Sequence, residues 1–199
     1  MKATMRWMAA ALLMATLAAC ESKADTAPSS EPVPTMPAVE VAPPESGTAR
    51  ADALLAMKHA SNFVLYSLEP WTDRVSSDSE GFSCRRGNCL AENAVLGQVN
   101  VTDAASLEVV RTAVRESLGK IPNYATACIA EYRHAIGFDA DGKRYRVFLC
   151  YGCGQLGIEV DGQDVADGEQ TFEMGDEKAL NAILARAGIP LAKTAPGAD

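Results

Sequence analysis

Apolar residues recur with helical spacing in three parts of the chain. The first is residues 49–60, in which Leu54, Leu55 and Met57 are placed to face a core. The two longer stretches carry their apolar stripes at Leu107, Val110, Val114 and Leu118, and at Leu180, Ile183, Leu184 and Ala187. Each stripe predicts a helix that packs by one face on a shared core.

Start and stop signals bound the two longer helices. Thr102 or Asp103 is suited to cap the first of them, and Gly119 is suited to end it. Asp176 is suited to cap the last helix, which the Gly-Ile-Pro of residues 188–190 should terminate. The caps therefore predict where both helices begin.

Strands are predicted between these helices. Residues 63–66 read as a strand that stops before Pro70, and residues 95–101 read as the next one. The segment between them, residues 71–93, is polar and reads as a loop.

A two-residue turn predicts the register of a later hairpin. The Asp-Gly pair at residues 141–142 favours a tight turn. It sets Ala140 opposite Lys143, and pairing then continues outward to His134 opposite Leu149. This register puts the apolar residues on one face, and a slip by one residue would scramble them. The opposite face then carries Asp139, Arg144 and Arg146.

The order of elements predicts the fold class. A second Asp-Gly pair at residues 161–162 extends the meander, so the chain reads helix, two strands, helix, antiparallel meander, helix. This order is typical of an α+β domain with helices packed on one face of an antiparallel sheet. We predict one such domain over residues 49–190, since roughly 140 residues support one core rather than two. Residues 191–199 are expected to be a disordered tail.

The first nineteen residues have the layout of a secretory signal. Lys2 and Arg6 form a basic segment, and an apolar stretch and small residues then lead to Cys20. The apolar stretch is too short to be a permanent membrane span. Residues 1–19 are therefore predicted to be a signal peptide.

Residues 17–20, Leu17-Ala18-Ala19-Cys20, resemble the lipobox of bacterial lipoproteins. The resemblance implies cleavage before Cys20 and lipid on its sulfur and on the new amino terminus, which is enough for stable anchoring. In lipoproteins of this type, Asp at the second mature position implies retention at the inner membrane. Glu21 stands there, so we expect the periplasmic face of the outer membrane. The alternative is a soluble secreted protein with an incidental cysteine at its cleavage site.

Composition separates the domain from its anchor. Residues 20–48 are rich in Pro, Ala, Ser and Glu without hydrophobic periodicity, and are predicted to be a disordered tether with a span of about 30 Å. Loss of Lys2 and Arg6 changes the formal net charge from −8 to −10. Such an acidic chain argues against nucleic-acid binding and against a second contact with anionic lipid.

Two cysteines close together raise the question of redox chemistry. Cys150 and Cys153 follow one predicted strand and precede another. A thioredoxin-type pair needs its first sulfur at the start of a helix, so redox catalysis is disfavoured. Residues 152–157 also match the dinucleotide fingerprint, but no helix follows, and we discard that interpretation. Their glycines are expected to serve a bend or bulge.

Zinc binding is an alternative for the same cysteines. A four-ligand zinc site built on Cys150 and Cys153 could be completed by Cys128 with His134, or by Cys84 with Cys89. Exported thiols are normally oxidised, and the spacing from Cys84 to Cys89 suits a small disulfide loop, so we favour disulfides and predict no metal. The main alternative zinc ligands are Cys128, His134, Cys150 and Cys153.

With Cys20 lipidated and Cys84 paired, three cysteines are left. Extending the hairpin beyond its apolar pairs brings Cys128 diagonally beside Cys153 on the core face and turns Cys150 to the other face. We therefore predict a Cys128–Cys153 disulfide with Cys150 as a free thiol. Cys150–Cys153 and Cys128–Cys150 bonds are left open.

Several segments resemble an uncharacterised family of bacterial proteins, over about residues 60–190. That family pairs a Tyr-Ser-Leu-Asp/Glu-Pro segment with Cys-x4-His and Cys-x2-Cys, and the resemblance implies no activity. Here five residues separate Cys128 from His134. The matching segments are Tyr66-Ser67-Leu68-Glu69-Pro70, Val95-Leu96-Gly97, Arg133-His134-Ala135-Ile136 and Leu149-Cys150-Tyr151-Gly152-Cys153.

No catalytic set stands out. His59 and His134 are the two histidines, and the common hydrolase, metalloprotease and P-loop motifs are missing. We therefore predict a non-enzymatic binding module with a protein partner in the periplasm and no cofactor beyond the lipid. One concrete version is an immunity or inhibitor lipoprotein against a toxin or a cell-wall hydrolase. The alternative is a thiol- or zinc-dependent enzyme or metal-binding protein.

Overall fold

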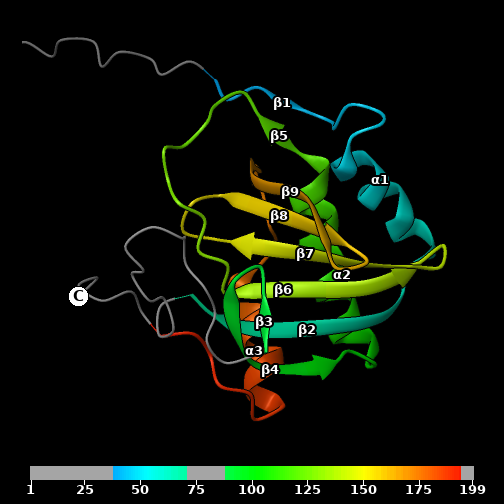
Figure 1. The fold of residues 1–199 in the computed structure, drawn as a ribbon, viewed down its shortest axis with the longest axis vertical. Helices are drawn as coiled ribbons and strands as arrows, with labels where there is room; N and C mark the ends of the chain where they lie inside the picture. Colours follow the sequence, from blue (N-terminus) through cyan, green and yellow to red (C-terminus); the bar gives the residue numbers. More distant parts are fainter. Residues whose placement is uncertain (1–37, 71–87, 194–199) are drawn as a thin grey trace, which may run out of the picture. The chain divides into compact units, whose positions relative to one another are not determined.

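A seven-stranded antiparallel sheet forms the centre of the fold in the computed structural model, which describes residues 38–70 and 88–193 (Figure 1). The predicted α+β class is confirmed. The strands lie in the order β3-β4-β2-β6-β7-β8-β9, so β6 to β9 form the predicted meander. Their bounds are β2 Ser61–Glu69, β3 Cys89–Leu90, β4 Asn93–Asn100, β6 His134–Ala140, β7 Lys143–Cys150, β8 Gln155–Val160 and β9 Gln163–Gln170.

The helices contribute to one core on one face of this sheet. Figure 1 shows α2 and α3 behind the strands. The bounds are α1 Ala49–Ala56, continued by the 3₁₀ turn η1 Met57–His59, then α2 Ala104–Gly119 and α3 Glu177–Arg186. The caps agree with the sequence: the carboxylate of Asp103 accepts from the Ser106 amide at 2.9 Å, and that of Asp176 from the Lys178 amide at 2.8 Å.

The predicted stripe of α1 is partly wrong. Leu55 is 59% exposed, whereas Arg50, Ala53 and Ala56 are the buried positions. The buried face of this short helix is formed by Arg50 and two alanines, whereas Leu54 packs only partly against the core and Leu55 points to solvent. The stripe of α2 is confirmed: Leu107 is partly buried, and three residues are fully buried in the core, namely Val110, Val114 and Leu118.

The predicted hairpin register is confirmed. β6 and β7 pair from Ala140 opposite Lys143 to His134 opposite Leu149. Asp141 and Gly142 both have positive φ, at 52° and 75°, as a two-residue turn of this kind requires.

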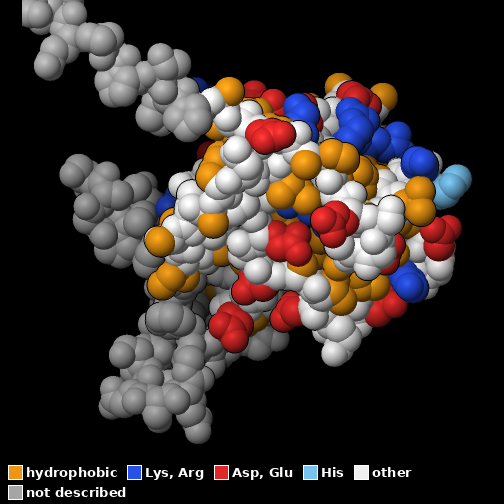
Figure 2. Space-filling view, turned by 90° about the horizontal axis from the view of Figure 1, so that it is seen from above, with side chains coloured by type: hydrophobic (Ala, Val, Ile, Leu, Met, Phe, Trp, Pro, Cys, Tyr) orange, Lys and Arg blue, Asp and Glu red, His pale blue; other side chains and the backbone are white. Residues whose placement is uncertain are grey.

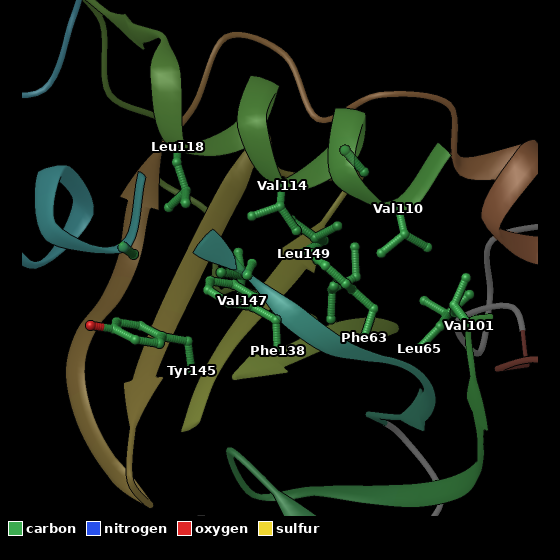
Figure 3. Close-up of a cluster of buried hydrophobic side chains, with 14 of the residues drawn as sticks. Phe63, Leu65, Val101, Val110, Val114, Leu118, Phe138, Tyr145, Val147 and Leu149 are labelled. Atoms are coloured by element: carbon green, nitrogen blue, oxygen red, sulfur yellow. The ribbon is translucent and has the colours of Figure 1, made fainter. Parts of the chain in front are cut away.

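The main core lies between this sheet and the helices. Figure 3 shows α2 side chains pointing onto residues of β2, β6 and β7. Burial of this apolar surface is the main favourable term in folding. The residues labelled there are Phe63, Leu65, Val101, Val110, Val114, Leu118, Phe138, Tyr145, Val147 and Leu149, and all belong to the cluster.

The opposite face of the sheet carries a second apolar cluster that the sequence analysis missed. The predicted charged residues occupy only one end of that face, where Asp139 pairs with Arg144 and Arg146 pairs with Glu159. Towards the other end the same face is apolar and is covered by residues 130–132 and by the β3–β4 turn. Its buried members are Val64, Tyr66, Leu68, Tyr132, Ala135, Phe148 and Cys150.

The ordered chain extends beyond the predicted ends of the domain. The tether was predicted to reach residue 48, but β1 Val41–Ala42 pairs with β5 Ile121–Pro122. The tail was predicted from residue 191, but the Lys193 amide donates to the carboxylate of Glu69 at 3.0 Å. Bonds made by the backbone need neither an apolar composition nor hydrophobic periodicity, and the tether was bounded by these two signals.

Candidate functional site

The loop of residues 123–133 is the part of the fold with the most unusual surface. It leaves β5 and has no regular structure until β6 begins at His134. Ala130 and Tyr132 lie inward on the second apolar cluster, while residues 123–129 are exposed. Ile129 is 74% exposed and Tyr124 is 44% exposed, so the loop presents two large apolar side chains to solvent.

Tyr132 fixes the inner end of this loop. Its ring packs on Phe148 with centroids 5.5 Å apart, and its hydroxyl donates to the carboxylate of Asp167. The Gly168 amide donates to the same hydroxyl at 3.0 Å. Burial, with the neighbouring Asp167, raises the pKa of Tyr132 well above its usual range, so the side chain is neutral at physiological pH.

Gly157 makes room for that tyrosine. A Cβ at this position would lie 2.9 Å from the Tyr132 hydroxyl, closer than real contacts allow. The register of β8 with β9 also shifts between Leu156 and Ile158. This is the bulge that the sequence predicts for the glycines of residues 152–157.

The structure joins Cys128 to Cys153 with their Cα atoms 6.0 Å apart. This is the pairing that the sequence favours, but the predicted route to it is wrong. Gln155 pairs with Cys150 and Gln170, not with Cys128, because the chain leaves the sheet before residue 134. Cys128 consequently lies in the exposed loop rather than on the core face.

Cys150 and His134 lie on opposite faces of the sheet. Cys150 is a free cysteine, 1% exposed, in the second cluster. His134 faces the helices, where its Nε2 donates to the Asn181 amide oxygen at 2.8 Å and its ring meets Tyr151 edge-on. The four alternative zinc ligands are therefore not brought together, and no group of three or more metal-ligating side chains occurs among residues 38–70 and 88–193.

The environment of His134 is that of a core residue. Nδ1 is buried without a hydrogen-bond partner. Burial lowers the pKa of His134, and the hydrogen bond with Asn181 offsets this in part. The imidazole is therefore neutral at physiological pH and holds β6 to α3.

Other predicted site residues lie outside the described residues. They are Cys20 and Cys84. The predicted Cys84–Cys89 bond therefore stays a prediction. Within the described part of the chain, no helix is both long and apolar enough to cross a membrane.

The three cysteines around the loop also line one cavity of about 420 Å³, together with Glu131, Arg133, Tyr151, Gly152 and Glu177. The sequence analysis did not foresee this arrangement, nor the exposure of Ile129. Neither has a local pattern in the sequence, because both depend on the path of the loop over the sheet.

No family model, no curated protein and no solved structure matches this chain. The resemblance to an uncharacterised bacterial family therefore stays a prediction.

Proposed function

We propose that the protein is a lipid-anchored, non-enzymatic binding module on the periplasmic face of the outer membrane, and that residues 123–131 are its contact element. The observation that carries the proposal is the exposure of Ile129 on a loop that is held in place. The signal peptide, the predicted lipid on Cys20 and the tether support the location.

The loop is held from several sides. The Cys128–Cys153 bond ties its middle to the turn before β8. The hydroxyl of Thr126 donates to the Cys153 carbonyl at 3.2 Å, and Tyr132 anchors the inner end. A loop already ordered in this way loses little conformational entropy when a partner binds, which favours affinity.

The exposed apolar residues suit the centre of a contact. Binding energy in protein interfaces is concentrated in a few large side chains surrounded by a polar rim. Ile129 and Tyr124 would supply such anchors. Figure 2 shows acidic side chains spread over the face seen from above, with hydrophobic ones between them, and basic ones gathered mainly along one rim.

Site-specific crosslinking tests the contact element. A photo-crosslinking amino acid is placed at position 129 of the full-length protein in cells, with position 165 of β9 as the matched control because Val165 is also exposed, at 45%. We expect a distinct crosslinked protein from position 129 alone. Equal products from both positions would contradict the proposal.

A binding titration with the recovered partner completes the test. Ile129→Asp should weaken binding by about 2 kcal/mol, or roughly 30-fold, whereas Val165→Asp should have little effect. Unchanged binding by Ile129→Asp would exclude the loop as the contact element.

We further propose that the partner is a toxin or a cell-wall hydrolase, which makes the protein an immunity or inhibitor lipoprotein. Its acidic charge suits a basic partner. Stoichiometric loss of the partner's enzymatic activity on addition of the protein would support this version. If the partner keeps its full enzymatic activity when it is saturated with this protein, the immunity or inhibitor role is excluded. The proposed binding role would not be affected.

A further inference from the structure

Three cysteines, two in a disulfide and one free, line one cavity on one side of the domain. Cys128 and Cys153 form the disulfide, and the free Cys150 lines the same cavity. A disulfide and a thiol that share a cavity are the two reactants of thiol–disulfide exchange.

Cys153 is within bonding reach of both other cysteines. Its Cα lies 6.0 Å from that of Cys128. Its amide donates to the Cys150 carbonyl at 3.3 Å, which closes a β-turn through Tyr151 and Gly152. The ends of such a turn are less than about 7 Å apart, which is also the limit for a disulfide.

The Cys150 sulfur is held against the loop that carries Cys128. It accepts a hydrogen bond from the Glu131 amide at 3.2 Å, and Glu131 is three residues from Cys128. Cys150 is 1% exposed, whereas Cys128 lies on the exposed part of the loop. The Cys150 sulfur is thus protected from solvent, whereas Cys128 lies in a segment that is exposed to it.

We propose that these residues form an internal thiol–disulfide exchange centre. Cys150 gives its proton to water in the cavity that it lines, and its thiolate attacks the Sγ atom of Cys153. A Cys150–Cys153 bond forms, the Cys128–Cys153 bond breaks, and Cys128 leaves as a thiolate that takes up a proton. There is no net oxidation, so no external oxidant or reductant is needed.

The exchange changes the surface rather than the core. It moves the free thiol from a buried position to exposed Cys128, and it releases the loop from the turn before β8. This differs from a thioredoxin-type pair, whose reactive sulfur lies at a helix N-terminus and acts on other proteins. The exchange does not depend on the role proposed above for Ile129.

Alkylation of the native protein tests this inference without a variant. Full-length protein purified in detergent without reductant is incubated with N-ethylmaleimide at pH 8, and its peptides are mapped without reduction. We expect label to accumulate on Cys128, about tenfold above that on Cys150, together with a new Cys150–Cys153 bond. Label confined to Cys150, with the Cys128–Cys153 bond intact, would overturn the inference.

Two variants identify the attacking sulfur. Cys150→Ser removes it, so labelling of Cys128 should fall about tenfold, and undiminished labelling would overturn the inference. Cys128→Ser leaves Cys150 and Cys153 as the partners, and in oxidised glutathione they should form a bond. If both stay free thiols in a folded protein, the turn does not permit the second state.

Discussion

Arg50, in the first turn of α1, donates from Nε to the Leu118 carbonyl at the end of α2, at 2.8 Å and across 68 residues of sequence. Its remaining N–H groups donate to the carbonyls of Ser117, Lys120 and Gln170. The last carbonyls of a helix have no partner within it and form the negative end of its dipole. Arg50 therefore ties α1, the end of α2 and β9 together.

Replacing this arginine should destabilise the domain strongly. Arg50 is 2% exposed, and burial lowers its pKa to about 10, so it still carries its charge at neutral pH. Arg50→Met removes a donor from four carbonyls, although those of Ser117 and Lys120 keep bonds from Thr171 and Phe172, and it should cost about 3 kcal/mol in urea unfolding. Arg115→Met is the control, since Arg115 is exposed in an ion pair with Glu108, and should change stability by less than about 1 kcal/mol. Similar losses in both variants would contradict this role.

His134 should make the protein sensitive to mild acid. Its folded pKa lies below its unfolded value of about 6.5, so between the two values the unfolded chain binds more protons. Stability should therefore fall as the pH drops below about 6.5, by up to about 1.4 kcal/mol per pH unit. Urea unfolding at pH 7.5 and pH 5 measures this.

The two histidines provide a matched comparison for that measurement. His134→Gln should flatten this part of the pH dependence, whereas His59→Gln should leave it unchanged because His59 is exposed. A pH dependence that persists in full in His134→Gln would assign it to other groups.

The disulfides can be mapped in protein that is quenched with acid at the moment of cell lysis. We expect Cys128–Cys153 and Cys84–Cys89 peptides, with Cys150 alkylated only after unfolding. Cys128→Ser should lower stability by up to about 3 kcal/mol, since the bond closes a long loop, and loss of Cys84–Cys89 should have a smaller effect. A Cys128–Cys150 peptide would contradict both this prediction and the exchange centre.

The anchor is tested by fractionation. If Cys20 is lipidated as proposed, Cys20→Ser should give an unlipidated protein that no longer fractionates with the outer membrane, because it lacks the acyl chains that would hold it there. Glu21→Asp in the lipidated protein should shift it towards the inner membrane. If Cys20→Ser leaves the membrane fraction unchanged, the lipobox interpretation is wrong.

The sequence by itself determined the local features of this fold. The stripe and cap of α2, the cap of α3 and the β6–β7 register all depend on residues that are close along the chain. Helical spacing, side-chain capping and an Asp-Gly turn each act over a few residues, so they could be predicted from the sequence.

Only the tertiary structure decided the features that join distant segments. The burial of Arg50 and the second apolar cluster depend on elements that are far apart in the chain. The Cys128–Cys153 disulfide shows most clearly which features the sequence does not determine. The sequence favoured this pairing among three, but by a register that does not extend to Cys128, and the position of Cys128 in an exposed loop could not be predicted because the sheet pairing begins only at His134. Packing over the sheet, which no local pattern encodes, sets the path of that loop and with it the exposure of Ile129.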